Sequence, residues 1–368
     1  MRASRNSGSV CAVHSRSSRL SPSPRLSPTR RRILATAVTV GLVAAACGSD
    51  DDDADSADDT SGDSTEAGLV VATTVAPITS LAANVIGDNA AIIGIVPEGT
   101  NSHTFEPQPS VAELVTDANV IFINGLVLEE PTKELALANK PDDTPLIELG
   151  DETIDPEDYK YDYSFPEDEG KPNPHLWTDP SLALNYAAII RDTMSEVDPD
   201  NADAYAANYD TLAECVDGLD AAMREAFDTI PEENKLLLTY HDAYAYFAEN
   251  YGFEVIGAIQ PADFGDPSPR EVADLIDQVS ATGVPALFGS EVFPSPVLDQ
   301  IAGEAGGTYV DTLRDDDLPG KPGDDDHSWV GLMRSNYITM TDALGGDPAA
   351  LEAFEICGAA PDNAEYPQ

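Results

Sequence analysis

Short apolar runs alternate with amphipathic segments along most of the chain. The runs have the length and content of buried strands, and the segments after them repeat apolar residues at helical spacing. Strands are expected at 69–75, 90–96, 119–125, 144–149, 235–240, 253–259, 285–290 and 308–313, and helices at 78–87, 110–118, 179–197, 242–252, 268–283, 296–306 and 328–344. This alternation predicts an α/β fold of parallel sheets flanked by helices.

A longer apolar stripe lies at the middle of the chain. From Tyr205 to Ile230, apolar residues recur at steps of three and four, and Pro231 ends the pattern. The stripe predicts one amphipathic helix of about eight turns, roughly 40 Å long. The strand and helix pattern is similar on both sides of it. We therefore expect two pseudo-symmetric α/β lobes joined by one long, rigid backbone helix.

The N-terminus has a different character. Residues 1–46 contain eight arginines and no acids, and they end in the apolar run Ile33–Ala46. That run is too short for a permanent membrane span, and a basic segment before a short apolar one is typical of an export signal. Cys47 follows small residues, as in the lipobox of bacterial lipoproteins, where the cysteine is lipidated. "TRRRIL" also resembles a twin-arginine signal, so the export route stays open between Sec and twin-arginine.

The acidic composition limits the partners. The formal net charge is -48 and the pI about 4.1, which excludes nucleic acid because phosphate binding needs a basic face. Cations suit such a chain, although most of the acids serve solubility alone. Of the four cysteines, Cys11 lies in the export signal and Cys47 is the lipidation candidate. Cys215 and Cys357 remain, and an even pair in an exported protein predicts a disulfide.

These patterns divide the chain into five parts. The predicted parts are an export signal at 1–46, a disordered acidic tether at 47–67, an N-terminal lobe at 68–198, the linking helix at 199–231 and a C-terminal lobe at 232–368.

Three histidines lie at similar places in the pattern, at intervals of about 70 residues. His103 follows a predicted strand, His175 precedes a predicted helix, and His241 lies between a strand and a helix. Asp311, in "TYVDTL", occupies a fourth such junction. Ligands bind at the carboxyl ends of parallel strands, so these four side chains are expected to meet between the lobes. Three imidazoles and one carboxylate suit a borderline divalent metal such as zinc.

The motifs around these histidines carry a family resemblance. "GTNSHTFEP", "NPHLWTDP" and "HDAYAYFAENYG" are similar to three motifs of the zinc/manganese class of solute-binding proteins of bacterial ABC importers, and "NGLVLEE" resembles a fourth. The resemblance runs from about Leu69 to the last predicted helix. It implies metal ligands at His103, His175, His241 and an acid that Asp311 matches best.

The resemblance also implies a function. The chain is expected to be a monomeric, lipid-anchored receptor outside the cytoplasmic membrane, not an enzyme, which captures Zn(II) with high affinity and delivers it to a permease driven by an ATPase. Manganese is the alternative cargo. Manganese receptors of this class more often have a carboxylate at the third position, where this chain has His241.

Other functional classes fit less well. A zinc hydrolase would need an open coordination position and a base such as Glu106 or Asp242, and the chain has no HExxH motif. A calcium-binding adhesin is disfavoured because the aspartate runs lack EF-hand spacing. The acidic loop 315–327, with His327 among six aspartates, is interpreted as a surface loop, with a weak auxiliary metal site as the alternative.

Overall fold

The computed structural model describes residues 68–260, 267–290, 296–311, 313–358 and 364–366. The predicted export signal, the acidic tether and Cys47 lie outside these residues. In the part of the chain that is described, no helix is both long and apolar enough to cross a membrane.

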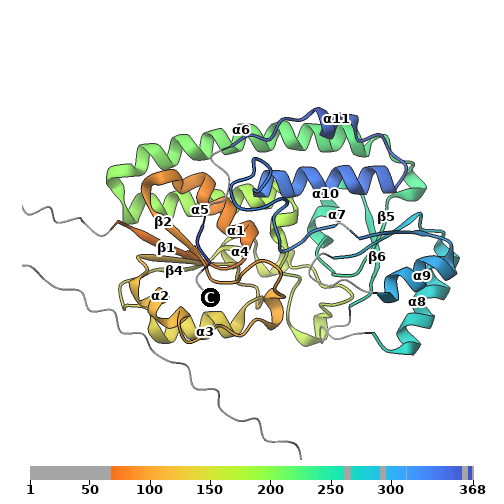
Figure 1. Cartoon of the computed structure of the whole chain (residues 1–368), viewed down its shortest axis with the longest axis horizontal. Helices are drawn as coiled ribbons and strands as arrows, with labels where there is room; N and C mark the ends of the chain where they lie inside the picture. The colour runs from red at the N-terminus through yellow and green to blue at the C-terminus, as the bar shows by residue number, and fades with distance from the viewer. Residues whose placement is uncertain (1–67, 261–266, 291–295, 312, 359–363, 367–368) are drawn as a thin grey trace, which may run out of the picture. The chain divides into compact units, whose positions relative to one another are not determined.

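The first lobe is built on a four-stranded parallel sheet. Its strands are β1 (Val70–Thr73), β2 (Ala91–Gly94), β3 (Val120–Ile123) and β4 (Leu146–Glu148), in the order β2-β1-β3-β4. Its helices are α1 (Ala76–Ile86), α2 (Val111–Asp117), α3 (Glu130–Asn139) and α4 (Leu149–Thr153). In Figure 1, α1 and α3 lie on opposite sides of the sheet.

The apolar residues of β3 explain this layering. Val120 and Phe122 belong to the large core cluster that contains α1, whereas Ile121 and Ile123 belong to a second cluster with residues of α2 and α3. Successive side chains of a strand point to opposite faces, so a run of four apolar residues needs cover on both. All four are buried.

The second lobe repeats the same topology. Its strands are β5 (Leu236–Thr239), β6 (Glu254–Ala258), β7 (Ala286–Phe288) and β8 (Thr308–Val310), in the order β6-β5-β7-β8. Its helices are α7 (Ala245–Tyr251), α8 (Pro269–Thr282) and α9 (Pro296–Ala305). In each sheet the strand order reverses, between β1 and β3 in the first lobe and between β5 and β7 in the second. Ligands of parallel α/β sheets bind at such switch points, at the carboxyl ends of the strands.

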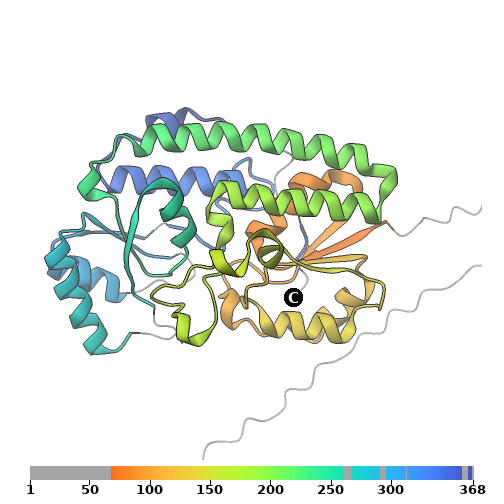
Figure 2. The ribbon, with the colours of Figure 1, turned by 180° about the vertical axis from the view of Figure 1, so that it is seen from behind.

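Two long helices lie between the two sheets in the chain, and the second of them joins the lobes. α5 (Pro180–Val197) begins after Asp179, whose carboxylate accepts from the backbone N–H groups of Ser181 and Leu182. α6 (Ala202–Phe227) packs on α1, α5, α10 (Trp329–Ala343) and α11 (Ala349–Ala353). Figures 1 and 2 both show α6 running above the two sheets. One apolar core cluster contains α6 residues together with strand residues from both sheets, so the helix joins the lobes through a shared core.

The end of the chain returns to the first lobe. Cys357 forms a disulfide with Cys215 of α6. Farther along, Glu365 pairs in parallel with Ile93 of β2, and its carbonyl accepts from the N–H of Gly94 at 2.9 Å. The C-terminal residues therefore contact the N-terminal sheet, although the sequence pattern assigned everything from 232 to 368 to the second lobe.

The predicted fold class is confirmed: two similar lobes with parallel sheets are joined by a long helix. The linking helix begins at Ala202 and ends at Phe227, three residues before the predicted stripe ends. The exact domain boundaries stay predictions.

Candidate metal centre

Each of the three predicted histidines lies at an element end that faces the other lobe. His103 is in a short 3-10 turn after β2, where the side chain of Asn101 accepts from its backbone N–H. His175 directly precedes the turn that leads into α5. His241 follows β5 by two residues, at the switch point of the second sheet.

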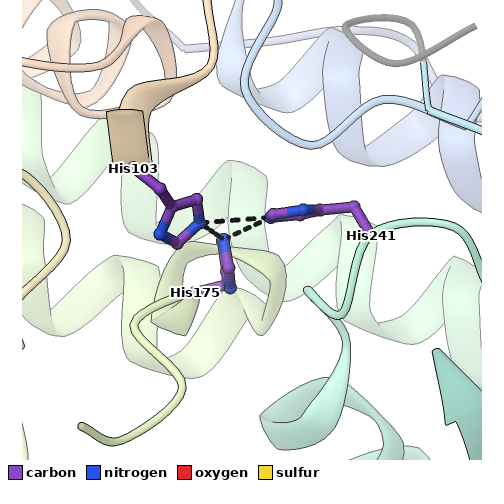
Figure 3. Close-up of side chains that lie close together, drawn as sticks. All are labelled: His103, His175 and His241. Carbon is purple, nitrogen blue, oxygen red and sulfur yellow. Dashed lines mark hydrogen bonds between the residues drawn. The ribbon is translucent and has the colours of Figure 1, made fainter. Parts of the chain in front are cut away.

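The three imidazole rings converge on one point (Figure 3). The Nε2 atom of His103 lies 3.3 Å from that of His175 and 3.3 Å from that of His241. The Nε2 atoms of His175 and His241 are 2.9 Å apart. Zn–N bonds of 2.0–2.1 Å place the nitrogens of a tetrahedral site about 3.3–3.4 Å apart. Two of the three separations fall at this value and the third is shorter.

Side-chain amides orient two of the rings. Nδ1 of His175 is 2.8 Å from Oδ1 of Asn173, and Nδ1 of His241 is 2.7 Å from Oε1 of Gln260. The Asn173 amide cannot be flipped without loss, because its Nδ2 donates to the Asp162 carboxylate and to the Asp242 carbonyl. Nδ1 of His175 therefore carries the proton and donates it to the Asn173 oxygen.

This tautomer leaves the Nε2 lone pair of His175 facing Nε2 of His241 at 2.9 Å. A cation between the rings would be bound by this lone pair. Burial, followed by the charge of neighbouring His241, lowers the pKa of His103 and of His175 well below the ordinary value. Both rings are therefore neutral at pH 7, which is the form that binds metals.

Two consecutive buried aspartates lie beside the histidines. Oδ2 of Asp315 is 3.4 Å from Nε2 of His241, and Oδ1 of Asp315 accepts from the Ser290 hydroxyl. Asp316 accepts from the hydroxyl of Ser102 at 2.8 Å, while its Oδ1 is buried and has no hydrogen-bond partner among the described residues. Burial raises the pKa of Asp316, and the charge of His241 opposes this rise. A dication would neutralise both carboxylates.

Asp311, the acid expected from the sequence, is in a different place. It follows the last residue of β8 and is exposed. Among the described residues, the set whose ligand atoms all lie within 4.8 Å of one another consists of the three histidines, and Asp315 approaches His241. Beyond Asp311, Leu313 and Leu318 are both buried, one on either side of the aspartates in the sequence. In the sequence, these two apolar residues beside the aspartates were the one indication that the acidic run is not a surface loop.

Hydrogen bonds join the two lobes on both sides of the centre. On one side, the Asp316 carboxylate holds Ser102, and the backbone N–H of Gly99 donates to the Asp317 carboxylate at 2.7 Å. On the other side, Ser164 donates from its N–H to Asp242 and from its hydroxyl to the Gln260 carbonyl. Several of these residues are chain neighbours of the metal-centre residues, so the contacts between the lobes and the centre share the same loops.

A small cavity of about 70 Å³ borders the cluster at His103. Leu126, Phe165 and Lys171 are among its lining residues, whereas His175 and His241 do not line it. His103 is half-buried, while the other two histidines are 0% and 3% exposed. The centre is therefore deeply enclosed around His175 and His241, and it approaches this cavity at His103.

His327 lies apart from the cluster. Its ring is buried, and its Nδ1 is 3.0 Å from the carbonyl of Pro319. This hydrogen bond to the backbone explains why the His327 ring can be buried, and no metal-ligand set among the described residues includes His327. The acidic loop around it is partly buried, not a wholly exposed surface loop.

Known proteins resemble this chain over most of its length. The manganese-binding lipoprotein MntA of Halalkalibacterium halodurans is 28% identical over 307 residues, which are 83% of this chain and 96% of that protein. The metal ABC transporter substrate-binding lipoprotein SsaB of Streptococcus sanguinis is 28% identical and covers 67% of this chain and 86% of its own. Among solved structures, the periplasmic zinc binding protein TroA from Treponema pallidum superimposes with a TM-score of 0.68 at 22% identity, covering 75% of this chain and 99% of that one.

A family model matches residues 71–343, which hold both sheets, the linking helix and all three histidines of the cluster. The chain belongs to the family described as zinc-uptake complex component A, periplasmic, a family of substrate-binding proteins of metal ABC transporters.

Proposed function

We propose that the chain captures Zn(II) with high affinity between its two lobes and delivers it to the permease and ATPase of a metal ABC importer. The observation that carries the proposal is the convergence of three Nε2 atoms, two of them 2.9 Å apart and the third 3.3 Å from each. A cation at their centre would be bound by all three nitrogens. Zinc binds imidazole nitrogen more readily than harder ions do.

The fourth ligand in this proposal is a carboxylate of the Asp315–Asp316 pair. Asp315 is the stronger candidate because its Oδ2 already lies 3.4 Å from Nε2 of His241. A small rotation of its side chain would complete a tetrahedral shell of three nitrogens and one oxygen. With no position left for a reactive water, the site is suited to binding and not to hydrolysis.

Manganese is the second candidate cargo, supported by the name of one relative, the manganese-binding lipoprotein of Halalkalibacterium halodurans. Manganese favours carboxylate, carbonyl and water oxygens, and divalent ions bind a given site more weakly at the manganese end of the series. Three imidazoles therefore favour zinc. The proposal also places a lipid anchor at Cys47, so that a monomeric receptor stays at the outer face of the cytoplasmic membrane.

Elemental analysis of the purified protein, followed by zinc–manganese competition, tests the cargo. One equivalent of zinc that manganese cannot displace at equal concentration is expected. Asp315→Asn should weaken zinc binding by roughly 10- to 100-fold or more, because it removes a ligand or its charge. Asp311→Asn is the matched control and should bind as the unaltered protein does. Tight binding of manganese in preference to zinc would contradict the zinc assignment.

A further inference from the structure

The segment 160–171, which we term the strap, lies before α5 in the chain and contacts the second lobe beside the metal centre. Within it, Ser164 donates from its N–H to the Asp242 carboxylate at 2.9 Å and from its hydroxyl to the Gln260 carbonyl at 2.7 Å. These partners are the chain neighbour of His241 and the residue that holds its Nδ1. The strap is therefore tied to the backbone and side chains that fix one of the three histidines.

The residue after Ser164 is Phe165, and its ring lies against the cluster. The ring centroid is 5.6 Å from that of His103 and 5.7 Å from that of His175. Phe165 is 5% exposed, and its carbonyl accepts from the N–H of Asp162 at 2.9 Å. Backbone bonds at Asp162, Ser164 and Phe165 thus hold the phenyl ring in one place, over two of the three imidazoles.

The phenyl ring also lines the cavity that borders the centre. That cavity, of about 70 Å³, is lined by His103, Phe165, Pro166 and Lys171 among others. A water molecule takes about 30 Å³ in the liquid, so the cavity has room for a few of them. Water there would lie next to His103, and the apolar ring both lines the cavity and contacts the rings of His103 and His175.

Ions differ in how much water they keep. Zinc is satisfied by four protein ligands, whereas magnesium and manganese sites are commonly octahedral and rich in oxygen ligands, including water. Side chains that keep water from becoming a fifth or sixth ligand therefore reduce the affinity for zinc little and the affinity for manganese more. The apolar shell around a metal site is a recognised control of solvent access.

On these grounds, and resting on the proposed metal-binding function, we propose that Phe165 is a specificity-determining residue. Its ring closes the coordination sphere on the cavity side, holds the bound ion at four ligands and so favours zinc over manganese. It acts by excluding water and does not itself bind the ion.

Cobalt(II) gives a direct readout, because its visible bands are intense in a four-coordinate site and weak in a five- or six-coordinate one. The unaltered protein loaded with cobalt is expected to show intense bands. Phe165→Ala should weaken them, as water from the cavity reaches the ion, and should reduce the ratio of zinc to manganese affinity by about 10- to 100-fold. Phe165→Leu keeps an apolar cover and is expected to retain both the bands and the ratio.

Tyr163→Ala is the matched control, since Tyr163 is an aromatic residue of the same strap that is 54% exposed. It should change neither readout. Phe165→Val, with an intermediate side chain, serves if the alanine variant does not fold, and should give intermediate values. Weak cobalt bands in the unaltered protein, or an unchanged ratio in the folded alanine or valine variant, would overturn the proposal.

The outcomes separate this inference from the proposed function. If the unaltered protein binds neither zinc nor cobalt, the metal-binding function itself fails. If it binds both at the histidines and the Phe165 variants keep the unaltered ratio, only the role of Phe165 is refuted.

Discussion

His175 and His241 are held differently from His103. The first two are buried, and their Nδ1 atoms meet amide oxygens of Asn173 and Gln260 at 2.8 and 2.7 Å. His103 is half-buried, sits in a short turn and lines a cavity. The comparison suggests that His175 and His241 form a preorganised pair with fixed rings, while His103 closes the site from the more open side. Preorganised ligands lose less freedom on binding and contribute more of the affinity.

Alanine substitution of each histidine is expected to give the largest effects. Structural zinc sites are worth about 10–16 kcal/mol over four ligands, so losing one costs on the order of 100- to 1000-fold in affinity. His175→Ala and His241→Ala should lie at the upper end. His103→Ala should lie at the lower end, because water from the cavity can take the vacated position.

Zinc competition titrations with a chromophoric chelator would measure the zinc dissociation constants of the three variants. His327→Ala is the control, a buried histidine outside the cluster. Equal losses of zinc affinity in the three cluster variants would contradict the distinction between His103 and the other two histidines. Unchanged zinc affinity in all three would contradict the assignment of the metal site.

Removing the amide that holds His241 should have an intermediate effect. Gln260→Met keeps the length of the side chain but takes away the oxygen that accepts from Nδ1. Loss of such an orienting partner typically costs 10- to 100-fold in metal affinity. Gln278→Met, in the same lobe, is the matched control. An affinity unchanged by Gln260→Met would mean that the ring is held by packing alone.

The smallest expected effect is that of changing the pH by one unit. Burial lowers the pKa values of His103 and His175, so protons compete with the ion at these rings only below their ordinary pKa of about 6.5. Burial raises the pKa of Asp316, so this carboxyl keeps its proton to a higher pH in the metal-free protein. Zinc affinity should therefore fall on acidification as Asp316 and these histidines take up protons, by at most about tenfold per pH unit for each proton.

Zinc dissociation constants measured from pH 8 to pH 5 test this expectation. Asp316→Asn should remove the contribution of that carboxyl to the pH profile and leave the part that comes from the histidines. A variant profile parallel to that of the unaltered protein throughout would show that Asp316 does not exchange its proton when zinc binds.

Residues with a strong local pattern were predictable from the sequence. The apolar run of β3, the proline and aspartate at the start of α5 and the stripe of α6 each specify one structure locally. The three histidines were found because each lies at an element end. What the pattern did not show depends on contacts distant in sequence: Asp315 lies beside His241 although 74 residues separate them, and the pairing of Glu365 with β2 leaves no periodic signal.

X-ray absorption at the zinc edge of the loaded protein tests the central claim most directly. The account predicts one zinc ion bound by three imidazole nitrogens at about 2.0–2.1 Å and one carboxylate oxygen, with an imidazole lost from the spectrum in each single histidine variant of the cluster. A zinc ion with fewer than three imidazole ligands, or a spectrum that none of these variants changes, would contradict it.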